Sequence, residues 1–143
     1  MPSFGTLSKV RLDECHLHLQ LIFNEVVKNF DCAVICGHRS QVHQNAAYNA
    51  KPRKTKLRWP KSKHNKKPSH AVDVAPYPVD WKDHSRFYFF AGYVMCVADG
   101  MDIPLIWGGD WDGDREVDDQ EFNDLVHYEL DVAKYSKTHP TTR

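Results

Sequence analysis

The sequence predicts an α+β domain in which helices flank a small antiparallel sheet. Segments with helical periodicity and short apolar segments follow one another without the regular alternation that a parallel βαβ sheet requires. The chain has 143 residues, which suits one hydrophobic core and is too short for two ordinary domains. Its 41% hydrophobic and 12% aromatic residues are typical of a folded protein. We therefore expect one domain that spans residues 1–143.

Three segments have the apolar spacing of helices. Residues 7–30 place large apolar side chains at helical spacing, which predicts one amphipathic helix packed on the core. Residues 40–50 are compatible with a helix that Ser40 caps. Residues 84–100 carry apolar side chains on one face and end at Gly100, a residue typical of helix C-caps.

Four short apolar segments predict the strands. They span residues 32–36, 71–75, 105–107 and 125–130. The segment that follows residue 50 contains several prolines, which break a helix, so we expect an exposed loop there. In a sheet of this kind, the polar residues at the strand ends gather in one cleft.

The formal net charge is +0, but the charges are separated along the sequence. Residues 51–67 carry nine of the 19 basic side chains and no acidic one, whereas residues 110–131 carry ten of the 19 acidic side chains and one basic residue, Arg115. A total of zero argues against a strongly basic protein that binds nucleic acid. The two segments are either solvated loops of opposite sign or the flanks of a site that uses charge.

The spacing of the cysteines and the first residues of the chain indicate the cellular compartment in which the protein is made. No CxxC pair or zinc-finger spacing occurs, so we expect buried free thiols at Cys15, Cys32, Cys36 and Cys96. The first residues lack the apolar segment of a secretory signal, and no run of about 18 apolar residues could span a membrane. We therefore expect a protein that is made in the cytosol and forms no stable association with a membrane.

Three segments carry histidine or aspartate at strand edges, namely residues 62–64, 71–73 and 124–129. Two imidazoles and one carboxylate are a known ligand set for catalytic zinc, with water in the fourth position. The chain has nine histidines, so spacing alone does not select the ligands.

The order of the motifs resembles a known family. SKH is followed by AVDVAPY, then by WGGDWD, and then by a D-x-x-H-x-E segment. In this order they resemble the zinc-dependent peptidoglycan peptidases, which include the phage L-alanyl-D-glutamate endopeptidases and the D-Ala-D-Ala carboxypeptidases and dipeptidases. The resemblance covers residues 37–130 and is strongest to small phage endolysins. It implies a single catalytic domain with the fold of the zinc D-Ala-D-Ala peptidases and hedgehog-like proteins.

The resemblance also implies roles for individual residues. His64, Asp73 and His127 would bind Zn²⁺. Asp124 matches the catalytic carboxylate that activates the zinc-bound water and passes its proton to the leaving amine. Arg39 matches an arginine that stabilises the developing oxyanion or a substrate carboxylate.

The spacing before Asp73 departs from the family pattern. The family's SxHxxGxAxD is two residues longer here, where HNKKPSHAVD places His70 three residues before Asp73. His70 is therefore a rival zinc ligand. We favour His64 because it keeps the Ser-x-His context, and because strand alternation would place His70 and Asp73 on opposite faces.

Further residues are candidates for supporting the site. Strand alternation places Glu129 on the same face as His127, so Glu129 is predicted to orient that ligand, although a solvated glutamate is an equal alternative. Ser62 precedes the first ligand, and Trp107 could form a wall of the peptide cleft.

The acidic segment after Gly109 offers a second possible metal site. Asp110, Asp112 and Asp114 alternate as carboxylates do in a calcium loop. The segment lacks the glycine and the final glutamate of an EF-hand, so the other interpretation is that Asp110 braces the loop beside the zinc site.

The sequence therefore predicts a zinc peptidase that hydrolyses the L-Ala-D-Glu bond of peptidoglycan stem peptides as a phage endolysin. A D-Ala-D-Ala carboxypeptidase or dipeptidase is the alternative with the same metal site. A nucleic-acid-binding module that uses the basic segment and Trp59 is the alternative from another class. The expected partner is bacterial peptidoglycan, with no nucleic acid and with the chain as a monomer. The protein would be made in the host cytoplasm without a signal peptide and would act on the wall after release through the membrane.

Overall fold

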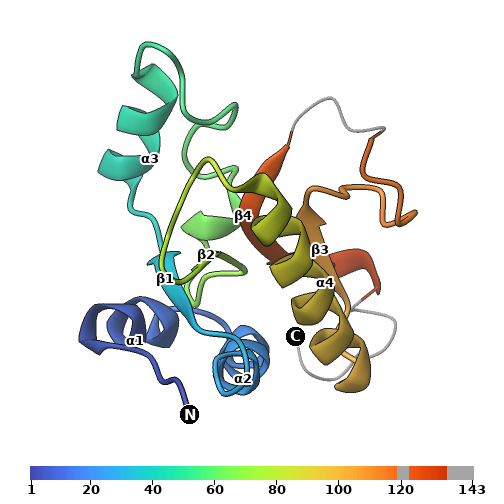
Figure 1. The fold of residues 1–143 in the computed structure, drawn as a ribbon. Helices are drawn as coiled ribbons and strands as arrows, with labels where there is room; N and C mark the ends of the chain where they lie inside the picture. Colours follow the sequence, from blue (N-terminus) through green and yellow to red (C-terminus); the bar gives the residue numbers. More distant parts are fainter. Residues whose placement is uncertain (119–122, 135–143) are drawn as a thin grey trace.

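The structure is a computed structural model and describes residues 1–118 and 123–134 (Figure 1). Its elements are, in chain order, α1 (Thr6–Asp13), α2 (Leu17–Val26), β1 (Cys32–Cys36), α3 (Gln41–Asn49), the 3₁₀ turn η1 (Lys63–Asn65), β2 (Ala71–Pro76), α4 (His84–Gly100), β3 (Leu105–Gly108) and β4 (Asp124–Leu130). The predicted α+β class is confirmed, and all four predicted strands are present.

The four strands form one antiparallel sheet in the order β1-β2-β4-β3. β2 therefore lies between β1 and β4 and is paired along both edges. Every residue of β2 except Asp73 is buried, which explains its apolar sequence. A carboxylate in the middle of such a strand is costly unless other groups compensate its charge.

The core lies between the sheet and two helices. α4 packs across β2, β3 and β4, and α2 packs beside α4 (Figure 1). The ring of Tyr128 in β4 lies 5.3 Å from Phe23 of α2 and 6.4 Å from Phe90 of α4, measured between ring centroids. Burial of each large apolar side chain stabilises the fold by about 2 kcal/mol, so these contacts fix the position of β4.

The N-terminal helical region differs from the prediction. We expected one helix over residues 7–30, but the chain forms α1 and α2 with a break between them. Cys15 forms an isolated bridge with Ser69, and the backbone N–H of His16 donates to the Ser69 carbonyl at 2.8 Å. The His16 ring then caps α2 by accepting from the backbone N–H of His18. The break between the helices thus lets the backbone of Cys15 and His16 pair with Ser69 in a distant loop. The helical periodicity of the sequence gives no indication of this pairing.

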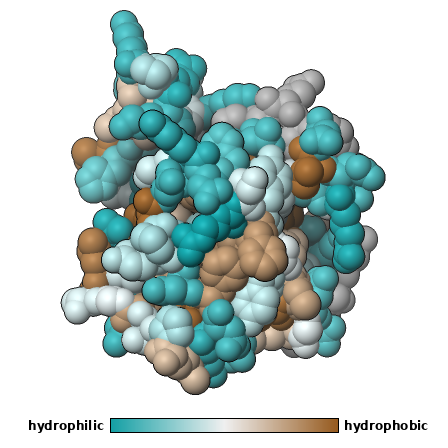
Figure 2. Space-filling model, in the orientation of Figure 1, coloured by the Kyte–Doolittle hydropathy of each residue, from teal (hydrophilic) through white to brown (hydrophobic). Residues whose placement is uncertain are grey.

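α3 and the loop after it form a lobe beside the sheet, away from α2 and α4 (Figure 1). Ser40 caps α3 as predicted, because its hydroxyl accepts from the backbone N–H of His43 at 3.3 Å. We call residues 51–67 the basic loop. All its lysines and arginines except Lys63 are exposed, and Figure 2 shows this lobe as mostly hydrophilic.

Smaller predictions are also corrected. Gly100 is the last residue of α4, and Met101 is its C-cap. Cys15 and Cys32 are buried as expected, but Cys36 is half-buried and Cys96 is exposed, so the prediction of four buried thiols is wrong for these two. Among the described residues, no helix combines the length and the apolar character needed to cross a bilayer.

Candidate metal centre and active site

One row across the sheet carries three side chains with metal-binding groups. The register pairs Cys36 of β1 with Asp73 of β2, and Asp73 with His127 of β4. A register shift between Val34 and Cys36 brings Cys36 into this row. The row therefore places a carboxylate between a thiol and an imidazole across three neighbouring strands of the sheet.

Asp73 is the common neighbour of two histidines. The Asp73 Oδ1 atom lies 3.1 Å from His64 Nε2 and 3.3 Å from His127 Nδ1. The two imidazole rings are 5.2 Å apart between centroids and meet edge to face. The structure thus brings together the three side chains that the sequence predicts as zinc ligands.

In each imidazole, the outer nitrogen, which is the one that points away from Asp73, has a hydrogen-bond partner of its own. His64 Nδ1 lies 2.7 Å from the Gly37 carbonyl oxygen, and His127 Nε2 lies 2.8 Å from Glu129 Oε1. A neutral imidazole that donates from its outer nitrogen has a lone pair on the inner nitrogen. Metal-binding histidines are held in this way by carbonyl or carboxylate acceptors. Glu129 therefore lies where strand alternation predicts it, beside His127.

The spacing of the donor atoms suits a metal ion. Zinc binds nitrogen and oxygen ligands at about 2.0–2.1 Å, so neighbouring ligands of a tetrahedral site lie about 3.3 Å apart. The two distances from Asp73 Oδ1 match this separation. Two donor groups overlap at Asp73, one with Cys36 and His64 and the other with Asp124 and His127, each with its donor atoms within 4.8 Å of one another. These residues fit a divalent metal that accepts nitrogen and oxygen donors.

The charged groups of the cluster shift one another's pKa values. Burial alone would raise the pKa of Asp73, but His64 and His127 hold this pKa well below its ordinary value. Burial alone would lower the pKa of His64, but the Asp73 carboxylate raises it to about 10. The pKa of His127 is also raised, because the hydrogen bonds that its ring donates to Asp73 and Glu129 outweigh burial. Metal binding must therefore displace protons from this cluster.

η1 holds His64 in place through a capping box. The Ser62 hydroxyl accepts from the backbone N–H of His64 at 3.2 Å, and Asn65 Oδ1 accepts from the backbone N–H of Ser62 at 3.1 Å. The His64 side chain is only 2% exposed. Ser62 is buried as well, so its hydroxyl positions the histidine backbone.

The rival ligand His70 lies outside both donor groups among the residues that the structure describes. It precedes β2, and its ring packs edge to face on His16, 5.7 Å away between centroids. The preference for His64 over His70 thus agrees with where the two side chains lie.

Arg39 lies at the margin of the cluster. Its Nη2 is 3.7 Å from Asp73 Oδ2, and its Nη1 donates to Gln44 Oε1 at 3.0 Å. Gln44 is fully buried and also donates from Nε2 to the Leu57 carbonyl. This chain of hydrogen bonds fixes one side of the guanidinium and leaves it part-exposed.

Asp124 begins β4, three residues before His127. Burial and the nearby negative charge of Asp73 raise the pKa of Asp124 above its ordinary value. A carboxyl group with a raised pKa is suited to accept and then return a proton near neutral pH. Gly108 pairs with Asp124, and a Cβ at position 108 would collide with the Asp124 carbonyl oxygen. The backbone of the two strands is therefore in close contact at Asp124.

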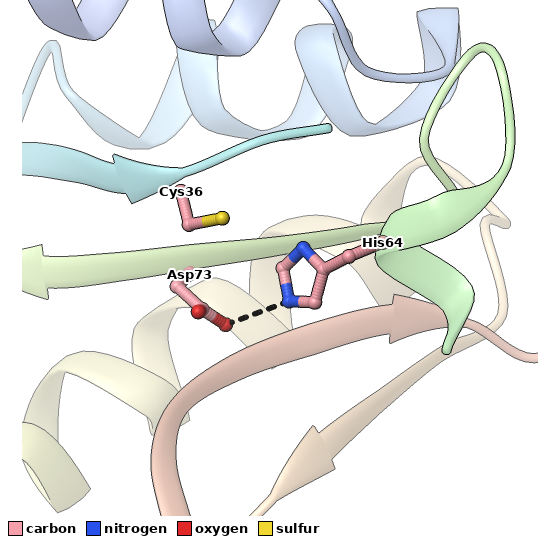
Figure 3. Close-up of side chains that lie close together, drawn as sticks. All are labelled: Cys36, His64 and Asp73. Carbon is pink, nitrogen blue, oxygen red and sulfur yellow. Dashed lines mark hydrogen bonds and ion pairs between the residues drawn. The ribbon is translucent and has the colours of Figure 1, made fainter. Parts of the chain in front are cut away.

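Cys36 is a neighbour of the cluster that sequence reasoning missed. Figure 3 shows the Cys36 side chain beside His64 and Asp73, with its sulfur on the His64 side. Although burial opposes ionisation, a hydrogen bond with His64 lowers the pKa of the thiol. The apolar sequence of β1 indicated only a buried thiol, because the register shift that turns Cys36 toward Asp73 leaves no local signal.

The two tryptophans of the WGGDWD motif have different surroundings. Trp107 is 5% exposed, and its indole N–H donates to the Leu125 carbonyl at 2.9 Å. It therefore supports β4 from within the core and does not line an open cleft. The Trp111 ring lies 5.3 Å from the His127 ring and is tilted by 36°. Trp111 is thus the tryptophan of this motif that contacts the cluster.

The acidic segment also forms a compact group. Asp110, Asp112 and Asp114 offer carboxylate oxygens within 4.8 Å of one another. Asp110 Oδ2 accepts from the backbone N–H of Arg115 at 2.9 Å, which agrees with a bracing role. Calcium binding by this segment stays a prediction.

The site combines metal-binding donors around Asp73 with a second carboxyl group at Asp124, an arrangement that suits metal-assisted hydrolysis. A model of the phage L-alanyl-D-glutamate peptidase family matches residues 2–131. The chain therefore belongs to this family and is a peptidoglycan hydrolase. The family match favours the L-Ala-D-Glu bond over the D-Ala-D-Ala bond and a peptidase over a nucleic-acid-binding module.

Solved structures show the same fold. The L-Ala D-Glu endopeptidase ChiX of Serratia marcescens superposes with a TM-score of 0.68 and 24% sequence identity, over 94% of each chain. A search of curated protein sequences returned no match.

Proposed function

We propose that the chain is a zinc-dependent L-alanyl-D-glutamate endopeptidase in which His64, Asp73 and His127 hold the zinc ion. One observation carries the assignment of the ligands. Asp73 Oδ1 faces the inner nitrogens of two imidazoles whose outer nitrogens are occupied by Gly37 and Glu129. Metal sites in proteins have this arrangement, and a core hydrogen-bond network does not require it.

A bound zinc ion would polarise the scissile carbonyl and lower the pKa of water at the site. Asp124 takes the proton from the attacking water and gives it to the D-Glu nitrogen as the peptide bond breaks. Its raised pKa supports this dual role. Arg39 carries a fixed positive charge beside Asp73 and stabilises the negative charge that develops on the carbonyl oxygen.

The proposed biological role is that of a phage endolysin. The protein would be made in the host cytoplasm and would reach the wall after release through the membrane. The basic loop supports a wall partner, since its exposed lysines and arginines can attract the carboxylates of stem peptides. Replacing several of these lysines with glutamine should weaken wall binding more at low salt than at high salt.

The first experiment combines metal analysis with product analysis. Purified protein should contain one zinc ion per chain, and exhaustive chelation should abolish lysis. Mass spectrometry of digested peptidoglycan should show stem peptides freed at the L-Ala-D-Glu bond. Release of terminal D-Ala would instead indicate a D-Ala-D-Ala peptidase, and full activity after chelation would contradict a metal mechanism.

The second experiment tests Asp124. Asp124→Asn should lower kcat by about 1,000-fold, the usual scale for loss of a general base or acid. Its zinc content should stay at the wild-type level. Asp13→Asn, an exposed position in α1, is the matched control. Unchanged turnover in Asp124→Asn would remove Asp124 from the mechanism.

A further inference from the structure

Asp73 has potential metal ligands on both of its neighbouring strands. β2 lies between β1 and β4, and the register places Cys36 opposite Asp73 on one side and His127 opposite Asp73 on the other. Residues that lie directly opposite on neighbouring strands point to the same face of a sheet. The thiol, the carboxylate and the imidazole therefore share one face, and Asp73 can offer a metal ion a position toward either strand.

The position toward β1 has three donors of its own. Cys36, His64 and Asp73 each offer one ligand atom, and these atoms lie within 4.8 Å of one another. Figure 3 shows the three side chains together, with the sulfur on the His64 side. Zinc binds sulfur at about 2.3 Å and nitrogen or oxygen at about 2.0–2.1 Å, so neighbouring ligands of a tetrahedral site that includes sulfur lie about 3.6 Å apart. An ion would therefore draw the donors together by up to about 1 Å.

The surroundings of the thiol suit a metal ligand. The Cys36 Sγ atom lies 3.7 Å from the Gly37 carbonyl oxygen, which also holds His64 Nδ1 at 2.7 Å. The same sulfur lies 3.9 Å from Arg39 Nη2. A thiolate, a carboxylate and a neutral imidazole cancel the charge of a divalent ion, whereas one carboxylate and two imidazoles leave a net charge of +1. The guanidinium of Arg39 therefore repels an ion with the first ligand set less than an ion with the second.

An ion in the position toward β1 lacks two residues of the proposed mechanism. Among the described residues, neither His127 nor Asp124 belongs to the donor group of Cys36. His64 and Asp73, in contrast, belong to both ligand sets. An ion in one position therefore excludes an ion from the other, and only the position toward β4 has the proposed acid–base group beside it.

We propose that Cys36, His64 and Asp73 form a second metal position, which takes thiophilic divalent ions such as cadmium and holds them away from Asp124. This inference rests on the proposed function, because it takes His64, Asp73 and His127 as the catalytic ligands. Soft thiolate ligands select soft metal ions, whereas imidazole and carboxylate do so less. Cadmium therefore inhibits the enzyme by occupying the two shared ligands.

Ultraviolet difference spectra detect a metal-bound thiolate directly. Cadmium added to metal-free protein should produce a sulfur-to-metal charge-transfer band, which nitrogen and oxygen ligands do not give. Cys36→Ser should lose this band and should bind cadmium about tenfold more weakly or worse, since loss of even an outer partner of a ligand has an effect of this size. Cys96→Ser removes an exposed thiol on α4 and is the matched control, which should keep the band. Absence of the band in wild type, or its presence in Cys36→Ser, would overturn the proposal.

Two further variants separate the second position from the catalytic one. His127→Gln should lose hydrolysis but keep the cadmium band, whereas Asp73→Asn should lose both. Loss of the band in His127→Gln would place Cys36 and His127 on one ion and would overturn the second position.

Inhibition provides a separate readout. Cadmium should inhibit lysis by zinc-loaded wild type at concentrations about tenfold lower than those that inhibit Cys36→Ser. Equal inhibition of the two proteins would contradict the proposed competition. If wild-type protein shows no zinc-dependent hydrolysis, the proposed function fails, while the cadmium band of metal-free protein still decides whether Cys36 binds the ion.

Discussion

The cluster around Asp73 and the acidic segment around Asp112 both gather three donors within 4.8 Å, but their donors have different partners. In the first, each of two imidazoles is bonded through one ring nitrogen to Gly37 or Glu129 and directs its other ring nitrogen at the same Asp73 oxygen. In the second, Asp112 Oδ1 and Asp114 Oδ1 accept from backbone N–H groups of their own loop. Proximity of donor groups alone is therefore a weak criterion for a metal site. A hydrogen bond on the far side of each ligand ring, as at His64 and His127, is a stronger criterion.

The largest expected effect comes from replacing an aspartate with asparagine in the Asp73 cluster, and the same replacement in the acidic segment serves as the control. Asp73→Asn removes the charge that the two histidines share and should leave a protein that loses zinc on dialysis and has no activity above background. Asp112→Asn should keep zinc and activity within about twofold of wild type, as usual for an exposed site. Metal content by mass spectrometry and lysis assays measure both. Equal loss of zinc in the two variants would abolish the distinction.

The hydrogen bond between His127 and Glu129 can be tested separately. Glu129→Gln keeps the shape of the side chain but weakens the acceptor for His127 Nε2, and it should reduce zinc affinity by about 10- to 100-fold. Competition with a chelator of known affinity measures this change. Glu116→Gln in the acidic segment is the matched control. A wild-type zinc affinity for Glu129→Gln would show that this hydrogen bond does not hold the ligand.

The pKa shifts predict opposite pH trends with and without metal. In metal-free protein, the raised pKa of His64 contributes stability below its ordinary value of 6.5, and this contribution is lost as pH rises toward about 10. The lowered pKa of Asp73 contributes stability above its ordinary value of 3.8, and this contribution is lost on acidification. The stabilisation by added zinc should instead grow with pH, because zinc displaces the imidazole protons.

Thermal melts across this pH range, with chelator or with zinc, measure both trends. His64→Gln should flatten the dependence in metal-free protein, whereas the exposed His43→Gln should retain it. A melting temperature of metal-free protein that rises between about pH 6.5 and 9 would contradict the assigned charges.

The smallest expected effect concerns calcium. Calcium prefers six to eight oxygen ligands, and the three aspartates supply only part of such a set. Calorimetric titration of calcium into zinc-loaded protein measures binding, and Asp114→Asn should remove any heat of binding without changing zinc content. Absence of heat in the wild type would end the calcium hypothesis.

Local sequence pattern predicted a part of the site that lies on a regular strand, because the alternation of β4 placed Glu129 beside His127. The preference for His64 over His70 came instead from the Ser-x-His context of the family, and His64 lies in the 3₁₀ turn η1. Contacts between distant segments were not predictable in this way. The break before α2 depends on Ser69, and the approach of Cys36 to Asp73 depends on a register shift.

A pocket between the first turns of α4 and the start of β4 was not predictable for the same reason. Trp81 precedes α4 and Leu125 lies in β4, and only the packing of α4 across the sheet brings them together. Large aromatic side chains are usually core residues, so the sequence gives no sign that Trp81 keeps half of its surface in solvent.

The close contact at Gly108 has a consequence for engineering the enzyme. No side chain fits at this position, because its Cβ would meet the Asp124 carbonyl, and Trp107 ties the next residue of β4 through the Leu125 carbonyl. These two residues separate the acidic segment from the strand that carries Asp124. Residues 112–118 could therefore be exchanged or lengthened while Asp124, the proposed acid–base group, keeps its position, provided that Trp107 and Gly108 are left unchanged.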